Sequence, residues 1–225
     1  MNFKKSWVIT KDGSHTLKID SLKETYHSLH GAVEESQFVY IEKGLRFWQK
    51  NHPKSNALIL EMGYGTGLLA YLSLLYQQKS QTSVGYTSVE AYPLSTEEFE
   101  RLNYNDFFGD KKILTFLNFS KLPWEISNKL NPQYTLLKRN ILFQEFETSI
   151  LYDVIYYDAF GAHAQPELWE VKWIKKCFDL LNSGGIWVSF CAKGTVRRAL
   201  QQVGFQVERL PGPPGKREML RAIKP

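Results

Sequence analysis

Strand-like apolar runs alternate with amphipathic segments along most of the chain. The runs lie at residues 57–61, 84–90, 134–138, 152–158 and 186–191. Around and between them, apolar side chains recur at helical spacing at residues 33–51, 67–78, 95–103, 166–181 and 194–203. A further short helix is expected to end near Leu130. Repeated alternation of strands and helices predicts a parallel sheet with helices on both of its faces.

Particular residues define some of these elements more closely. Val39 and Tyr40 widen the apolar stripe of the first helix, which should therefore pack against the sheet. Ser95 and Glu98 have the spacing of a capping box at the start of a helix. The Gly184-Gly185 pair is expected to end the helix before it, because glycine commonly follows the last helical residue.

The two ends of the chain depart from this alternation. Residues 6–20 are typical of a hairpin around an Asp12-Gly13 turn. The last two strands, at 205–209 and 218–223, are joined by a loop too short for a crossover and must be antiparallel to each other. This ending is typical of a Rossmann-like methyltransferase sheet. We therefore expect an α/β fold with a mostly parallel seven-stranded sheet, an antiparallel C-terminal strand pair and an N-terminal β-hairpin.

The length of 225 residues suits a single domain. Residues 1–32 would form a hairpin and loop extension, and residues 33–225 the Rossmann-like core. No apolar run approaches the roughly 20 residues of a membrane span, and the first residues lack the pattern of a secretion signal. Cys177 and Cys191 form no CxxC, so neither a disulfide framework nor a zinc site is indicated. We expect a cytoplasmic protein with no metal and no membrane partner.

Positive charge is concentrated near the C-terminus. The net charge of +5 and the isoelectric point near 9.0 are compatible with a polyanionic partner such as RNA. The last 33 residues hold eight cations and only two acids. The candidate RNA-binding residues are Lys193, Arg197, Arg198, Lys216 and Arg217. The alternative is a solvated basic face without a ligand.

A glycine turn follows the first strand of the core, with the sequence Glu61-x-Gly63-x-Gly65-x-Gly67. Alternate glycines allow a tight turn, and amide groups at the start of the next helix face it. The spacing differs from the dinucleotide fingerprint, and an acid ahead of the turn would repel a pyrophosphate. The acid suits a ligand that is cationic there, such as S-adenosylmethionine with its ammonium and sulfonium groups. The alternative is a purely structural turn.

Acids also end the second and fourth strands of the core. Glu90 stands where a carboxylate that accepts both ribose hydroxyls is expected. Asp158 stands where ligands and reacting groups meet in open α/β sheets, and Phe160 follows it closely. This pair predicts a pocket with a carboxylate for a polar or cationic group and a ring for a stacked base. The alternative is that Asp158 caps the helix starting near Pro166.

Tyr26 and His27 lie in a stretch without a clear hydrophobic period, at residues 24–32, just ahead of the first long helix. Polar and aromatic residues in such a stretch suggest a loop or short turn that covers another part of the molecule. The alternative is a structural connector.

Five segments, in the same order along the chain, resemble one known family. They are Tyr26-His27-Ser28-x-x-Gly31-Ala32-x-x-Glu35-Ser36-x-x-Val39-Tyr40, Glu61-x-Gly63-Tyr64-Gly65-Thr66-Gly67, Ser88-Val89-Glu90-x-Tyr92-Pro93-Leu94, Asp158-Ala159-Phe160 and Gly215-Lys216-Arg217-Glu218-Met219. The chain resembles the methyltransferase part of the tRNA 5-methylaminomethyl-2-thiouridine biosynthesis protein family (MnmC-like), without the FAD-dependent oxidoreductase part. The glycine turn is common to many methyltransferases, whereas the third and fifth segments are far more specific.

The resemblance implies a class I S-adenosylmethionine-dependent methyltransferase that N-methylates the 5-aminomethyl group of the wobble uridine in tRNA. The product would be 5-methylaminomethyl(-2-thio)uridine. The implied cofactor-binding residues are Glu61, Gly63, Tyr64, Gly65, Thr66, Gly67, Glu90, Ala91, Asn140 and Asp158. The implied catalytic residues are Asp158, Phe160, Tyr26 and His27. The partner would be the anticodon stem-loop of tRNA, and a separate enzyme would supply the aminomethyluridine precursor.

Two positions depart from the family pattern. Arg139-Asn140 stands where the family usually has Gly-Asp after the third strand. The side-chain oxygen of Asn140 would still accept a hydrogen bond from the adenine amino group. Gly161-Ala162-His163 stands where the family often has proline, so the substrate loop is expected to have a different shape.

In the mechanism that we expect, Asp158 orients the substrate amine and receives or relays a proton, while Tyr26 or His27 closes over the methyl group. Two other functions remain open at this point. The same fold would serve a methyltransferase that acts on a small amine or a protein. A non-catalytic RNA-binding module with a vestigial cofactor site is the second alternative, although the intact acids and glycines argue against it.

Overall fold

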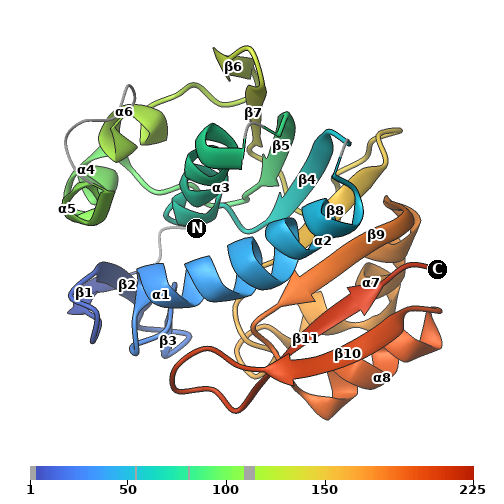
Figure 1. The fold of residues 1–225 in the computed structure, drawn as a ribbon. Coiled ribbons are helices and arrows are strands. Elements are labelled where there is room, and N and C mark those ends of the chain that lie inside the picture. The colour runs from blue at the N-terminus through green and yellow to red at the C-terminus, as the bar shows by residue number, and fades with distance from the viewer. Residues whose placement is uncertain (1–3, 54, 81, 109–114) are drawn as a thin grey trace.

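A mixed sheet runs through the middle of the molecule (Figure 1). The computed structural model describes residues 4–53, 55–80, 82–108 and 115–225, and these residues form eight strands in this sheet. In sheet order the strands are β10 (Gln206–Pro211), β11 (Glu218–Ile223), β9 (Leu181–Ser189), β8 (Tyr152–Tyr157), β4 (Ala57–Met62), β5 (Val84–Val89), β7 (Tyr134–Arg139) and β6 (Ser127–Asn131). The expected α/β fold is confirmed.

The central strands of the sheet are parallel. Strand β4 pairs in parallel with β5 and β8, and the parallel pairing continues to β7 on one side and β9 on the other. Ile59 and Leu60 point to opposite faces of β4, yet both are fully buried, because helices cover both faces. The carboxyl ends of the parallel strands therefore meet at one edge, where the candidate residues after β4, β5, β7 and β8 come together.

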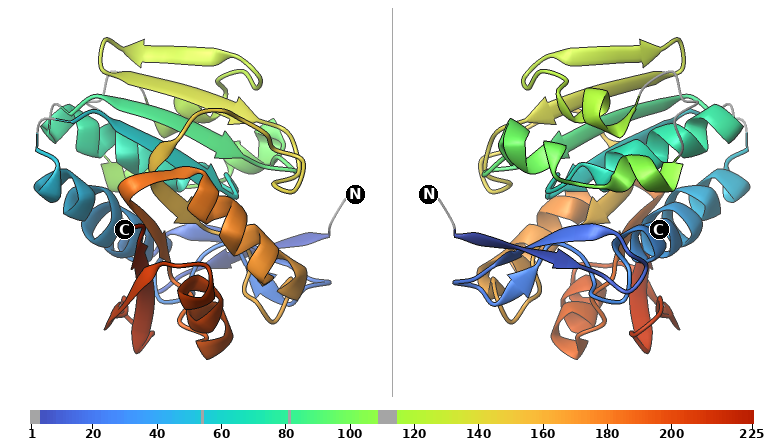
Figure 2. Two further views of the ribbon diagram at one scale, coloured as in Figure 1. Left: turned by 90° about the vertical axis from the view of Figure 1, so that its right-hand side faces the viewer. Right: turned by 90° about the vertical axis from the view of Figure 1, so that its left-hand side faces the viewer.

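Helices form a layer on each face of the sheet (Figure 2), and each layer has its own apolar core. One layer holds α3 (Leu68–Ser80) and a long continuous helix made of α1 (Ala32–Ser36), η1 (Gln37–Leu45) and α2 (Arg46–Asn51), of which η1 is π-helical. The other layer holds η2 (Pro166–Trp169), α7 (Val171–Asp179) and α8 (Gly194–Gln202). The predicted packing of the first long helix on the sheet is confirmed.

Three short helices pack beside α3. They are α4 (Thr96–Glu100), α5 (Tyr104–Phe108) and α6 (Phe116–Ser120). The ring of Tyr71 on α3 contacts aromatic rings of both α5 and α6. The predicted capping box is present, since the Ser95 side chain accepts a hydrogen bond from the Glu98 amide and the Glu98 side chain accepts one from the Ser95 amide.

Two predictions about elements are wrong. The segment expected to form a helix ending near Leu130 is the edge strand β6, which pairs antiparallel with β7, so the sheet has eight strands instead of seven. The turn at Pro132 lets the chain fold back from β6 into β7. Pairing with β7 stabilises Ser127–Asn131 as a strand more than its weak helical pattern favours a helix. The Gly184-Gly185 pair lies inside β9, because α7 already ends at Asp179 and the strand begins with a bulge.

The N-terminal segment forms a separate small sheet beside α1 (Figure 1). Its strands are β1 (Lys5–Ile9), β2 (His15–Ile19) and β3 (Glu24–Thr25). The predicted hairpin is therefore present, with one more short strand. Oδ2 of Asp12, in the hairpin turn, accepts hydrogen bonds from the amides of Val33 and Glu34 and so caps the long helix from outside. None of the helices in the described ranges has the length and apolar character needed to cross a bilayer.

Candidate functional site

A cavity of about 240 Å³ opens at the carboxyl edge of the sheet, beneath the N-terminal segment. It brings together many of the predicted site residues: Tyr26, His27, Gly63, Tyr64, Gly65, Glu90, Ala91, Asp158 and Phe160. Four carboxylates line it, those of Glu24, Glu90, Asp158 and Glu167, and its described lining includes no lysine or arginine. The electrostatic character of the cavity therefore favours a cationic ligand.

The glycine turn forms one part of the cavity wall. It passes between Asp158 and Tyr26, which leave no room for side chains on Gly63 and Gly65. A Cβ atom on Gly63 would lie 2.8 Å from the backbone oxygen of Asp158, and the φ angle there is +93°. A Cβ atom on Gly65 would lie 3.0 Å from Cδ1 of Tyr26. Glycine at these positions lets the main chain of β4 approach both the end of β8 and the N-terminal segment. The turn thus forms a cradle of main-chain atoms, as a cofactor needs.

Glu61 does not face this cavity. Its side chain is fully buried below the turn, and Oε2 accepts a hydrogen bond of 2.5 Å from the Ser88 hydroxyl. The buried Tyr86 hydroxyl also favours the charged form of Glu61, although Oε1 has no hydrogen bond of regular geometry with a described residue. Burial raises the pKa of Glu61 well above its usual value, which favours the neutral acid. The attraction for a cation that the sequence assigned to Glu61 therefore comes from the carboxylates that line the cavity.

Two other predicted cofactor residues support the turn from behind and do not line the cavity. The Thr66 hydroxyl is buried and lies 2.7 Å from Nε2 of His27, so it joins the turn to the N-terminal segment. The Gly67 amide donates a hydrogen bond to the Tyr64 carbonyl just before α3 begins. Both residues shape the main chain that the cofactor would meet.

Glu90 lies at the end of β5 and faces the cavity. Its Oε2 accepts a hydrogen bond from the Gly65 amide, and its Oε1 accepts one from the Tyr92 amide. Burial is the main cause that raises the pKa of Glu90, and the backbone amides oppose it. Each carboxylate oxygen has a second lone pair, so Glu90 is able to accept the two ribose hydroxyls without losing these contacts.

Asn140 lies at the end of β7 but does not line the cavity. Its side-chain nitrogen donates hydrogen bonds to the carbonyls of Glu90 and Ala91, which fixes the adjacent strand end. The neighbouring Arg139 forms an ion pair of 2.7 Å with Glu125. The residues that follow Asn140 do line the cavity: Ile141, Leu142, Phe143 and Gln144. Sequence reasoning missed these residues, although they directly follow the third strand.

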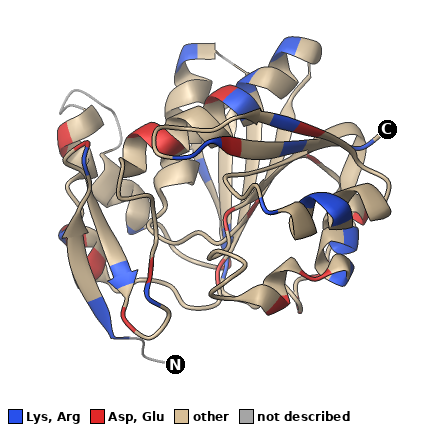
Figure 3. Cartoon of the chain, turned by 90° about the horizontal axis from the view of Figure 1, so that it is seen from below, with Lys and Arg blue, Asp and Glu red and all other residues tan. Residues whose placement is uncertain are grey.

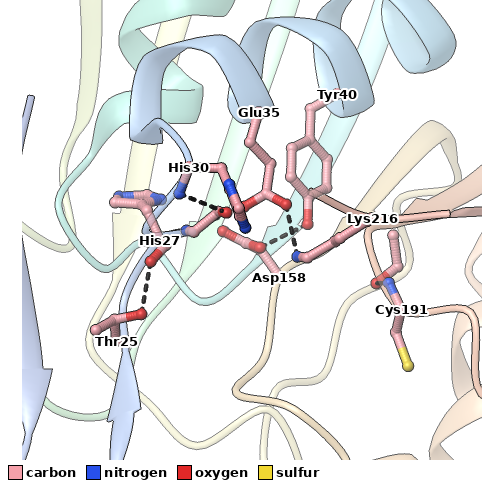
Figure 4. A network of polar contacts seen from close by, with 10 residues as sticks. Thr25, His27, His30, Glu35, Tyr40, Asp158, Cys191 and Lys216 are labelled. Carbon is pink, nitrogen blue, oxygen red and sulfur yellow. Dashed lines mark hydrogen bonds and ion pairs between the residues drawn. The ribbon is translucent and has the colours of Figure 1, made fainter. Parts of the chain in front are cut away.

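Asp158 is the centre of a network of polar contacts (Figure 4). The Tyr40 hydroxyl donates a hydrogen bond of 2.5 Å to its Oδ1. Burial raises the pKa of Asp158 to about 7. The Tyr40 hydrogen bond and Lys216 oppose that shift, whereas Glu35 adds to it. A carboxyl group with this pKa is able to exchange a proton near neutral pH.

Tyr26, His27 and Phe160 form the roof of the cavity over the turn. The rings of Tyr26 and Phe160 meet edge to face, with centroids 5.2 Å apart. His27 is held by Thr66, and burial lowers its pKa to about 4, so the ring is neutral at physiological pH. Tyr26 therefore lies where the sequence predicted a covering residue, while His27 connects the roof to the turn.

Tyr40 and Glu35 are the main residues that sequence reasoning left without a role. Tyr40 was assigned to the apolar stripe of the long helix, which is correct for its ring but not for its hydroxyl. Its hydrogen-bond partner is 118 residues away in sequence, so no local pattern reveals the contact. The only signal in the sequence is that Glu35 and Tyr40 both belong to the first family-like segment.

The predicted RNA-binding cations fall into two groups. Lys216 lies 2.5 Å from Oε1 of Glu35 and above the ring of Phe190, so it belongs to the Asp158 network. The other four cations form no ion pair with any described residue: Lys193, Arg197, Arg198 and Arg217. Figure 3 shows basic positions gathered on α8, whereas basic and acidic positions alternate along β10 and β11. These four cations remain the candidates for a polyanion surface.

Comparison with known proteins supports a methyltransferase. Residues 129–225 match a family described as S-adenosyl-L-methionine-dependent methyltransferase. The chain is 27% identical over 241 residues to the tRNA 5-methylaminomethyl-2-thiouridine biosynthesis bifunctional protein MnmC of Actinobacillus pleuropneumoniae serotype 5b, covering 95% of this chain and 34% of that protein. The protein of the same name from Idiomarina loihiensis is 28% identical over 221 residues, which are 88% of this chain and 35% of that protein.

Solved structures show the same fold. The structure of MnmC2 from Aquifex aeolicus matches with a TM-score of 0.79 and 24% identity, covering all of this chain and 72% of that one. Spermidine synthase from Thermotoga maritima matches with a TM-score of 0.60 and 14% identity, over 98% of this chain and 69% of that one. The resemblance found in the sequence is confirmed, as is S-adenosylmethionine as the cofactor. The chain spans about a third of the length of the curated relatives.

Proposed function

We propose that this chain, an S-adenosylmethionine-dependent methyltransferase, methylates the exocyclic amine of 5-aminomethyluridine at the wobble position of tRNA. The names of its relatives describe biosynthesis of tRNA 5-methylaminomethyl-2-thiouridine, and the substrate is taken from them. The observation that supports this choice best is the position of Asp158. Its carboxyl group, with a pKa raised to about 7, faces an acid-lined cavity beside the glycine turn.

The residues of the cavity fit S-adenosylmethionine. The glycine turn offers main-chain atoms to a ligand, and it packs so closely on the Asp158 backbone that a Cβ atom on Gly63 would collide with it. Glu90 would accept the ribose hydroxyls, and the apolar side chains of Ile141, Leu142 and Phe143, which line the same cavity, would offer a surface for the adenine ring. The lining carboxylates suit the positive charges of the methionine part.

When bound, S-adenosylmethionine supplies a methyl group that is already activated on a sulfonium sulfur. The protein then has to hold the amine in line with that group and receive its proton. Asp158 would orient the substrate and take one proton from its ammonium form, which frees the nitrogen lone pair to bond to the methyl carbon while the carbon–sulfur bond breaks. Tyr26 and Phe160 would cover the reacting groups and exclude water.

The acid lining also favours an amine over other nucleophiles. An aminomethyl group is mostly protonated at neutral pH, so the carboxylates of Glu24, Asp158 and Glu167 would attract it into the cavity. A phosphate or carboxylate substrate would be repelled by the same groups. The tRNA itself would be held outside the cavity, through phosphate contacts with Lys193 just ahead of α8, Arg197 and Arg198 on α8, and Arg217 in the β10–β11 loop.

Transfer of labelled methyl groups from S-adenosylmethionine tests this function and separates the alternatives. We expect label on tRNA that carries 5-aminomethyluridine and none on unmodified tRNA or on free small amines. Label on small amines or on a protein would instead favour a methyltransferase that acts on those substrates. Failure to bind S-adenosylmethionine in calorimetry, with tRNA binding retained, would favour the RNA-binding module.

A further inference from the structure

The Tyr40 hydroxyl reaches Asp158 from behind the cavity. Tyr40 is 2% exposed and does not line the cavity, whereas Asp158 does. The hydroxyl donates to Oδ1 at 2.5 Å, and no described group forms a hydrogen bond with Oδ2. The carboxyl group is therefore held by one oxygen, and the other is left for a ligand.

The backbone around Tyr40 has an unusual form that fixes this contact. Tyr40 lies in η1, a π-helical segment of nine residues within the long helix. Such segments are rare and are frequently found at functional sites. A Cβ atom on Gly44 would lie 3.1 Å from Val188 and 3.3 Å from Tyr156, so the helix lies directly on the sheet. The Tyr40 ring in turn packs on the Tyr156 ring, with centroids 5.3 Å apart.

Charged groups from several elements surround the same carboxyl group (Figure 4). Glu35 lies on the long helix, and its ion-pair partner Lys216 lies on the loop between β10 and β11. Asp158 in turn disfavours the charged form of Glu61, which lies below the turn. His27 also lines the cavity, where it is half-buried and neutral. Of these groups, only Tyr40 donates a hydrogen bond to the Asp158 carboxyl group, so it anchors Oδ1.

We propose that Tyr40 is a positioning residue, which holds Oδ1 of Asp158 so that Oδ2 faces the substrate amine and receives its proton. This inference rests on the proposed function, because it takes Asp158 as the group that meets the amine. A hydrogen bond donated to a carboxylate favours its charged form, so the Tyr40 hydroxyl also keeps Asp158 ready to accept a proton near neutral pH.

The Tyr40→Phe variant tests this role, because it removes the hydroxyl and keeps the ring. The matched control is Tyr156→Phe, which removes another fully buried hydroxyl from the same ring pair, whose nearest described partner is Ser73 at 3.4 Å. In Tyr40→Phe, the acid limb of the kcat–pH profile should move to higher pH by about one unit, so that kcat below that limb falls about 10-fold. The KM for S-adenosylmethionine should stay unchanged, and Tyr156→Phe should keep the wild-type profile.

Superimposable pH profiles of Tyr40→Phe and wild type would overturn the proposal. A second measurement tests the role of Tyr40 even if tRNA is not the substrate. In protein labelled with ¹³C at aspartate carboxyl groups, the Asp158 signal is identified by its loss in Asp158→Asn and is then titrated. The expected result is a higher pKa of Asp158 in Tyr40→Phe than in wild type and in Tyr156→Phe. Equal pKa values would contradict the role of Tyr40, whereas absent methyl transfer by wild type would contradict only the proposed function.

Discussion

The two ends of the cavity are built in different ways. The end expected to hold the cofactor consists mainly of one continuous stretch, the turn between β4 and α3, together with Glu90 from the next strand. The end expected to hold the amine is assembled from separate parts of the chain: Tyr26, Tyr40, Asp158 and the loop that carries Lys216. The first end offers main-chain atoms and one carboxylate held by two amides, whereas the second depends on buried side chains that hold one another.

This difference separates two tasks. A main-chain cradle is rigid and tolerates few substitutions at its glycines, but its electrostatic character depends little on protonation. The Asp158 end contains a carboxyl group with a pKa of about 7, so its chemistry changes near neutral pH. Substitutions at the first end should therefore affect binding of S-adenosylmethionine, and substitutions at the second end should affect turnover.

The largest effect is expected from Asp158→Asn. The amide keeps the shape of the side chain but is unable to accept the proton, so kcat should fall by about 10²–10⁴-fold. The dissociation constant for S-adenosylmethionine, measured by calorimetry, should change only a few-fold. Wild-type turnover by a folded variant that binds cofactor would show that the amine end does not depend on Asp158.

The next effect is expected from Gly63→Ala. The new Cβ atom would meet the Asp158 carbonyl at 2.8 Å, in a backbone conformation with φ of +93°. Strain of about 1–3 kcal/mol should weaken binding of S-adenosylmethionine by roughly 10–100-fold and lower the melting temperature. Gly194→Ala, at the first position of α8 and outside the cavity, is the matched control. Unchanged cofactor affinity in Gly63→Ala would contradict the assignment of the turn to cofactor binding.

A smaller effect on the same end is expected from Glu90→Gln. The amide is isosteric with the carboxylate but accepts at one atom only, so affinity for S-adenosylmethionine should fall about 10-fold. With saturating cofactor, kcat should stay close to wild type. If kcat instead fell strongly while cofactor affinity was unchanged, cofactor binding and turnover would not be divided between the two ends of the cavity.

The pH dependence of turnover sharpens the comparison without any mutation. Asp158 must be a carboxylate to receive a proton, so kcat should rise with pH through about 7, the pKa raised by burial. Below that value, each unit of pH should lower kcat about 10-fold. Cofactor affinity, measured over the same range, should vary less. A kcat that is flat through neutral pH would contradict the role of Asp158.

The smallest effect is expected from the surface cations. Replacing Arg197 and Arg198 by alanine should lower the slope of log affinity for tRNA against log salt by about two, if each contacts one phosphate. Arg209→Ala is the control, because Arg209 is already paired with Glu218. An unchanged slope in the double variant, or a slope near zero in wild type, would show that α8 does not hold the tRNA.

The features of this molecule that could be predicted from the sequence are those that depend on local patterns. The glycine turn, the acid that ends β5 and the antiparallel final strands each depend on neighbouring residues, and the structure contains all three. Strand β6 was missed because Ser127–Asn131 lacks alternating apolar residues and is stabilised by its pairing with β7. The roles of Tyr40 and Lys216 were missed because each depends on a partner in a distant part of the chain.

The identity of the methylated nucleoside is the most direct measure of function. Wild-type protein would be incubated with S-adenosylmethionine and tRNA that carries 5-aminomethyluridine, and the digested nucleosides would be identified by mass spectrometry. We predict conversion to the 5-methylaminomethyl nucleoside, with the methyl group on the exocyclic nitrogen. A methyl group on any other atom, or no conversion by protein that binds S-adenosylmethionine, would contradict the proposed function.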